Sequence, residues 1–163
     1  MKNSALLLLL AVSAICTAAE LKTGGVVLLQ PDQSLQQKGF VVSDLANYIR
    51  QVQAASISAV QPSQLPPSSG FVVVAVRAGG KSNAWLDISP SLPPELEQAF
   101  IQGLRQIPPF HVSNGTVLFG IQVMVNGAAP PTKKIPNPAA WQKAAATLKN
   151  PIEVENLVQV LWP

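Results

Sequence analysis

One alternating stretch constrains the fold of this chain more than any other feature. From Thr116 to Val125 an apolar side chain recurs at every second residue, and the turn pairs Asn114-Gly115 and Asn126-Gly127 flank the stretch. A period of two belongs to an extended strand, whose alternate side chains share one face. Because that face must be covered by a second layer, the chain has to build a sheet packed against other elements. The predicted apolar face consists of Val117, Phe119, Ile121, Val123 and Val125.

A hairpin is predicted upstream of this strand. Residues Phe71–Val76 are β-branched or aromatic, Ala78-Gly79-Gly80 supplies a turn, and strand character resumes from Ser82 to Ile88. Two such runs joined by a short glycine-containing turn are typical of antiparallel strands.

Two amphipathic helices flank the hairpin in sequence. We expect the first to run from Ser43, a suitable N-cap residue, to about Ala55. The second opens with Ser91 and Pro93-Pro94 and ends before Pro108-Pro109. Their apolar positions fall at helical spacing, with Leu45, Ile49 and Val52 in the first and Leu96, Phe100, Leu104 and Ile107 in the second.

The flanking regions differ from this central block. Glu20–Gln30 contains Gly24-Gly25 and then a short apolar run that suggests a short strand, and Gln30–Lys38 is polar and predicted to be loose. From Ala128 a proline- and lysine-containing linker leads to two short helices, which we expect to dock on the central domain. The predicted helix starts are Asn137-Pro138 and Asn150-Pro151, and the lining residues are Trp141, Ala144, Ala145 and Leu148 in one helix and Val154, Leu157, Val158 and Leu161 in the other.

The sequence therefore predicts an α+β fold. We expect a small antiparallel sheet of about three strands packed against two helices, plus two short C-terminal helices. The predicted divisions are a signal peptide (1–19), an N-terminal segment (20–42), an α+β domain (43–127) and a linker with a helical tail (128–163).

The N-terminus has the order of a cleavable export signal. Lys2 is followed by the apolar run Ala5–Ile15 and by small residues up to Ala19. The run is shorter than the roughly 20 residues that cross a bilayer, which favours cleavage over an uncleaved anchor. We expect cleavage after Ala19, with Ala18 and Cys16 as alternative sites; a lipoprotein modified on Cys16 is disfavoured because Ile15 stands where a small residue is needed.

Export indicates a periplasmic or secreted protein. The only cysteine lies within the signal, so the mature chain has none, which favours a bacterial envelope protein over a eukaryotic extracellular domain. Membrane association is expected only if the signal stays uncleaved.

Catalytic chemistry is scarce in this sequence. His111 is the only histidine, so a hydrolase triad or a histidine-based metal site would have to use it. A zinc site needs about four ligands at workable spacing, which the mature chain does not offer. The basic residues are scattered, so a nucleic-acid partner is not expected. We predict no catalytic residue, no metal site and no cofactor; an enzyme that uses His111 is the remaining alternative.

The stretch from Tyr48 to Gly127 resembles the C-terminal domain of the TonB and TolA families. The shared order is helix, connector with proline, strand, glycine-containing turn, strand, helix and a long strand that ends near Asn-Gly. The matching segments here are Gly70–Val76, Gly79-Gly80, Leu96–Ile107 and Val117–Gly127. The resemblance covers about half the chain, and it rests mostly on hydrophobic spacing. The long spacer of those families and the Tyr-Pro pair before their first strand are missing.

This resemblance implies a periplasmic module that binds a protein or an extended peptide along the edge of its sheet. We expect the long strand from Thr116 to Val125 to provide the edge, because the chain carries no catalytic set. The alternative is a structural or accessory envelope protein that docks through its C-terminal helices, using Trp141 and Trp162. The predicted partner-binding residues are Phe119, Ile121, Val123 and Val125.

Overall fold

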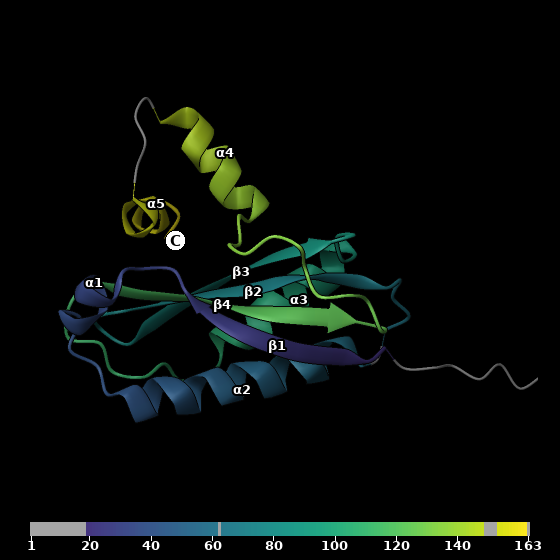
Figure 1. Ribbon diagram of the computed structural model, residues 1–163, viewed down its shortest axis with the longest axis horizontal. Helices are drawn as coiled ribbons and strands as arrows, with labels where there is room; N and C mark the ends of the chain where they lie inside the picture. The colour runs from purple at the N-terminus through teal and green to yellow at the C-terminus, as the bar shows by residue number, and fades with distance from the viewer. Residues whose placement is uncertain (1–18, 62, 149–152, 163) are drawn as a thin grey trace, which may run out of the picture.

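A four-stranded antiparallel sheet forms the centre of the molecule, in the order β1-β4-β2-β3 (Figure 1). The computed structural model describes residues 19–61, 63–148 and 153–162. Its strands are β1 (Leu21–Leu28), β2 (Ser68–Arg77), β3 (Lys81–Ser89) and β4 (Thr116–Val125). Its helices are α1 (Asp32–Gln36), α2 (Val42–Val60), α3 (Pro94–Arg105), α4 (Ala139–Thr147) and α5 (Val154–Val160).

The α+β prediction is confirmed, with one difference in strand number. Segment Leu21–Leu28 is a full strand that pairs antiparallel with β4, so the sheet has four strands rather than about three. The register shifts between Thr23 and Val26, where Gly24-Gly25 forms a bulge. Because a bulge exchanges the two faces of a strand, the sequence of β1 shows no continuous period of two, and only a short strand was predicted here.

Helices α2 and α3 cover one face of the sheet. On β2 this face consists of Val72, Val74 and Val76, which belong to the same buried cluster as Phe100 and Leu104 of α3. Helix α2 begins at Val42, one residue before the predicted start, and it runs beyond Ala55 to Val60. Val41 occupies its N-cap position and no side chain caps the helix there, so the predicted capping by Ser43 is wrong. The buried residues of α2 are Leu45, Tyr48, Val52, Ser56 and Val60.

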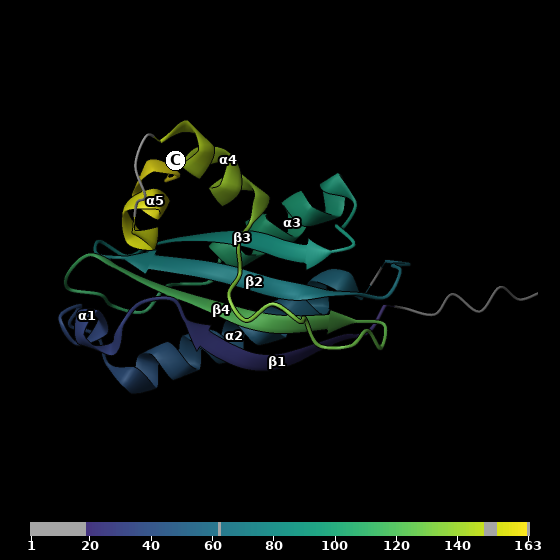
Figure 2. The ribbon, with the colours of Figure 1, turned by 45° about the horizontal axis from the view of Figure 1, so that its top comes forward.

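Helices α4 and α5 lie on the opposite face of the sheet, so the fold has three layers (Figure 2). The expected docking of the C-terminal helices is confirmed. Trp141 packs against Trp85 of β3 edge to face, with ring centroids 5.6 Å apart. The Arg77 guanidinium lies over the ring of Trp162 at 4.3 Å, a cation–π contact that ties the end of the chain to β2. The second core consists of Phe71, Val73, Ala75, Trp85, Leu118, Trp141, Leu157 and Val158.

A linker between β4 and α4 crosses this second face. Pro136 of the linker lies over Gly120 of β4, and a Cβ atom at position 120 would come within 3.2 Å of the proline ring. The linker is held at β3 by Asp87, whose carboxylate binds the ammonium group of Lys133 and accepts a hydrogen bond from the backbone N–H of Asn137 at 2.7 Å. We call residues 130–137 the strap.

Several predictions about the two ends of the chain concern residues outside the ranges that the structure describes. The predicted signal peptide up to Ala18, the lipidation candidate Cys16, and the predicted helix start at Asn150-Pro151 are not among the described residues. Within the described ranges, no helix has the length and apolar character that a membrane crossing needs.

Candidate functional site

The four predicted partner-binding residues lie inside the core between the sheet and helices α2 and α3. Phe119, Val123 and Val125 are 0% exposed and Ile121 is 1% exposed. Strand β4 pairs with β1 on one side and with β2 on the other, so the expectation that β4 offers a free edge is wrong. The reason is β1, which occupies the edge that a partner strand was expected to take. A partner therefore has only the outer edges of β1 and β3 to use.

The outer edge of β3 is blocked at one main-chain group by the protein itself. The Asn83 side chain folds back so that its Oδ1 accepts the backbone N–H of Ala84 at 2.9 Å. The same oxygen accepts a hydrogen bond from Nε of Arg105 on α3, also at 2.9 Å, which fixes the amide in place. Another strand that pairs with β3 would have to displace the Asn83 amide from the Ala84 N–H and to pass the strap at Asp87, so this edge is less accessible than that of β1.

The outer edge of β1 is open beyond its bulge. The backbone N–H of Leu29 donates to the carbonyl oxygen of Leu118 at 3.0 Å, which fixes the phase of the ladder. Hydrogen bonding alternates along an antiparallel strand, so the main-chain groups of Val26 and Leu28 point away from β4. Their side chains are 40% and 42% exposed, high values for valine and leucine in a sheet. No hydrogen bond between another described residue and these outward groups occurs in the structure.

An apolar pocket of about 400 Å³ adjoins the end of this edge. It opens between β1, the strap and the two C-terminal helices. None of the described residues that line it is charged, and the polar atoms of Gln30, which is one of them, are already bonded elsewhere. The lining residues are Val27, Leu28, Leu29, Gln30, Pro31, Ile135, Pro136, Asn137, Trp141, Val154 and Leu157.

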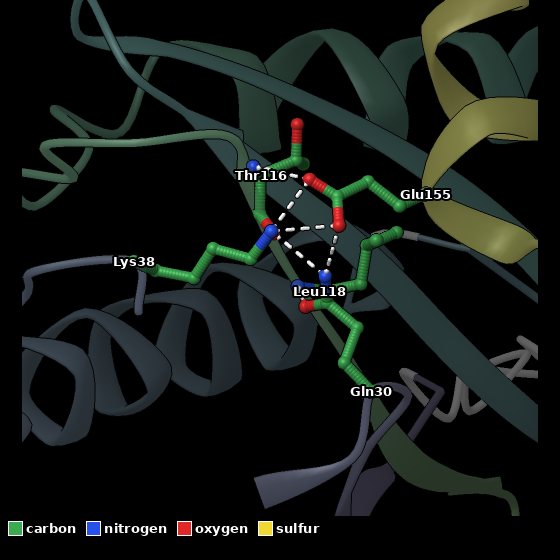
Figure 3. A network of polar contacts seen from close by, with 5 residues as sticks. All are labelled: Gln30, Lys38, Thr116, Leu118 and Glu155. Carbon is green, nitrogen blue, oxygen red and sulfur yellow. Dashed lines mark hydrogen bonds and ion pairs between the residues drawn. The ribbon is translucent and has the colours of Figure 1, made fainter. Parts of the chain in front are cut away.

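Gln30 extends the β1–β4 ladder with its side chain instead of its backbone (Figure 3). Its Nε2 donates to the carbonyl oxygen of Thr116 at 2.8 Å, and its Oε1 accepts the backbone N–H of Leu118 at 2.9 Å. A side-chain amide has the same donor and acceptor as a peptide group, so Gln30 takes the place of one more strand residue. This pairing fixes the point at which the chain leaves the sheet and turns toward α1.

A buried ion pair joins this point to the C-terminal helix. Lys38 Nζ donates to both carboxylate oxygens of Glu155 at 2.7 Å, and the two side chains are only 11% and 19% exposed. Glu155 also accepts the backbone N–H of Thr116 at 3.0 Å and Nε2 of Gln30 at 3.0 Å. We call Gln30, Lys38, Thr116 and Glu155 the polar node (Figure 3).

The electrostatics of the node favour a charged carboxylate. Burial raises the pKa of Glu155, but the hydrogen bonds from Lys38, Thr116 and Gln30 outweigh it, so the pKa lies below its ordinary value of 4.5. The node also lies against Gly115, where a Cβ atom would stand 2.6 Å from Glu155 Oε1 and 2.7 Å from Lys38 Nζ, so a side chain there would have to displace the bonded ion pair. The node therefore holds α5 beside the start of β4 and supports the wall of the apolar pocket.

His111 does not form a catalytic arrangement with its neighbour. It is exposed in the connection before β4, and its Nε2 lies 3.3 Å from Ser113 Oγ. The Ser113 hydroxyl donates to the carbonyl oxygen of Gly39 at 2.9 Å, so its proton is directed away from the imidazole. Across residues 19–61, 63–148 and 153–162, no group of three His, Cys, Asp or Glu side chains could hold a metal ion.

The residues that organise the site were not identified from the sequence. Gln30 and Lys38 stood at the ends of a segment predicted to be loose, yet they are 8% and 9% exposed. Glu155 lies in the predicted last helix but was not among the predicted site residues. Each bonds to residues about a hundred positions away, and no local pattern signals such a pairing. Trp141 and Trp162, the residues of the predicted docking surface, both contact other parts of the protein itself.

Comparison of the chain with protein-family models, with curated proteins and with solved structures found no match. The resemblance to TonB and TolA domains therefore stays a hypothesis about the order of the central elements.

Proposed function

We propose that this protein is an interaction module that captures an extended peptide segment of a partner protein along the free edge of β1. The proposal depends on one observation: the outward main chain of Val26 and Leu28 is open and lies next to an uncharged apolar pocket. Strand addition uses both features, since main-chain hydrogen bonds supply affinity and pockets for alternate side chains supply specificity.

The mechanism is binding without a chemical step. A partner segment aligned with β1 exchanges hydrogen bonds with the N–H and C=O groups of Val26 and Leu28. Its side chains alternate between the two faces of the sheet. On the α4/α5 side, one of them meets the pocket at the end of β1, between Leu28 and Ile135.

The chemistry of the pocket defines the side chain that it accepts. Its lining is mostly aliphatic and aromatic, and the amide of Gln30 is bonded within the protein through its nitrogen and its oxygen. A charged side chain would lose its water there and would meet no opposite charge among the described lining residues, which is unfavourable. We therefore expect a leucine, isoleucine, phenylalanine or methionine at this position of the partner. Because the N-terminal sequence predicts an exported protein, we expect the partner to be a protein outside the cytoplasm.

A backbone test separates strand addition from ordinary side-chain contact. In Val26→Pro the outward N–H is lost, whereas the ladder to β4 keeps its hydrogen bonds because that N–H does not take part in it. The matched control Val26→Ala removes the exposed side chain but keeps the N–H. The probes are fluorescein-labelled unstructured peptides with a single Leu or Asp at the same position, and binding is followed by fluorescence polarisation.

Strand addition at β1 predicts that the two variants differ in peptide binding. The Leu peptide should bind the wild type and Val26→Ala, and it should bind Val26→Pro at least ten-fold more weakly, with unchanged circular dichroism spectra in all three. Equal binding to both variants would mean that the main chain of β1 is not the docking edge. Equal binding of the Leu and Asp peptides would mean that the pocket does not select a side chain of the partner.

A further inference from the structure

Ala19 is part of the folded core. It is 3% exposed and belongs to the buried cluster that also contains Leu21 and Val60. Its backbone N–H donates to the carbonyl oxygen of Ser63 at 3.1 Å, which connects the start of β1 to the segment that follows α2. Both the side chain and the main chain of Ala19 therefore have native partners.

The next residue continues this anchoring. The backbone N–H of Glu20 donates to Asn126 Oδ1 at 2.8 Å, and the backbone N–H of Asn126 donates to the carbonyl oxygen of Glu20 at 2.8 Å. The side chain of Asn126 also binds the carbonyl oxygen of Leu65. The segment Ala19-Glu20 thus closes the end of the sheet where β1, β4 and the α2–β2 connection meet.

We infer that Ala19 is the first residue of the mature protein, so that signal peptidase hydrolyses the Ala18–Ala19 bond. The cut after Ala19 that the sequence predicts would remove a buried residue and leave the Ser63 carbonyl without its donor. A cut after Cys16 is the other alternative. The pair Cys16 and Ala18 places small residues at the third and first positions before the cut, with alanine at the first, which suits the peptidase.

The reaction adds one water across the amide bond. Ala18 leaves with the released peptide as a carboxylate, and Ala19 gains an α-ammonium group. The carbonyl oxygen of Ser63 can then accept a hydrogen bond from a charged donor in place of a neutral amide, which is the stronger kind of bond. This inference is independent of peptide capture, because it concerns only where the chain is cut.

The test is the intact mass of the exported protein. The full 163-residue chain is expressed in a Gram-negative host, released by osmotic shock and measured by mass spectrometry. We expect a single species that runs from Ala19 to Pro163. A species that starts at Glu20 or Thr17, a lipid adduct on Cys16, or the full-length chain in the membrane pellet would each overturn the inference.

Two matched variants locate the bond without touching the folded core. Under the inference, Ala18→Phe places a large residue directly before the cut and should abolish processing at this bond, whereas Thr17→Phe lies one position further away and should be processed like the wild type. If the cut followed Ala19 instead, the two variants would exchange behaviour. That exchange would contradict the inference.

Discussion

Removing the charge of Glu155 should destabilise the whole fold, although this residue lies near the end of the chain. In Glu155→Gln the Lys38 ammonium keeps its burial but loses its counter-charge. Removing one partner of a fully buried ion pair costs about 3–5 kcal/mol. Glutamine can still accept the Thr116 N–H, and the two side chains retain 11% and 19% exposure, so solvent screens part of the loss. We expect a decrease in the free energy of unfolding of about 2–3 kcal/mol.

The assay is urea unfolding of the mature protein, followed by far-ultraviolet circular dichroism at pH 7. Glu153→Gln is the matched control, because Glu153 is an exposed carboxylate just before the same helix. The double variant Lys38→Met with Glu155→Gln leaves no unpaired charge and should be at least as stable as Glu155→Gln alone. If the urea unfolding curves of Glu155→Gln and Glu153→Gln have the same midpoint and slope, the node neither holds α5 in place nor supports the wall of the pocket.

The same carboxylate predicts a pH dependence with a definite sign. The folded protein lowers the pKa of Glu155 below 4.5, so its contribution to stability is fully present above that value. The contribution is lost as the pH falls through the lower pKa of the folded state. Unfolding free energies measured between pH 7 and pH 3 should therefore fall more steeply for the wild type than for Glu155→Gln. Parallel profiles would contradict the assignment.

Two further predictions follow from the neighbourhood of the node and of the pocket. Gly115→Ala combines a backbone φ of +61° with a Cβ atom 2.6 Å from Glu155 Oε1. It should therefore lower the free energy of unfolding by about 1–3 kcal/mol more than Gly80→Ala, where φ is +66° and the space is open. Equal midpoints of the two variants in thermal unfolding would refute this steric argument. Ile135→Asp should weaken binding of an apolar peptide at least ten-fold, because Ile135 lines the pocket. Val160→Asp should leave binding unchanged, because Val160 is similarly exposed but does not line the pocket. The same loss in both variants would point to a non-specific effect of charge.

The central part of the fold could be predicted from the sequence because its signals are local. The alternation in Thr116–Val125, the glycine turn before Lys81 and the helical spacing around Phe100 each lie within one element, and the structure has those elements at nearly the expected bounds. The apolar stripes also predicted correctly that the C-terminal helices pack against the sheet.

The candidate site could not be predicted in the same way. The Gly24-Gly25 bulge interrupts the period of β1, so the strand that covers the edge of β4 was not counted in the sheet. This omission made β4 an apparent edge and turned core residues such as Ile121 into predicted binding residues. The pairing of Lys38 with Glu155 joins distant segments, and a single sequence contains no pattern for it.

The most direct test of peptide capture at β1 is a ¹H–¹⁵N NMR titration of the mature protein with an unstructured peptide that carries one leucine. The account predicts that the amide signals of Val26 and Leu28 shift together with that of Ile135, and that the two strand amides become protected from hydrogen exchange. It also predicts that the amide signal of Ala84, on the opposite edge of the sheet, stays unchanged. Shifts confined to β3 or to the outer faces of the helices, with Val26 and Leu28 unaffected at saturation, would contradict the central claim.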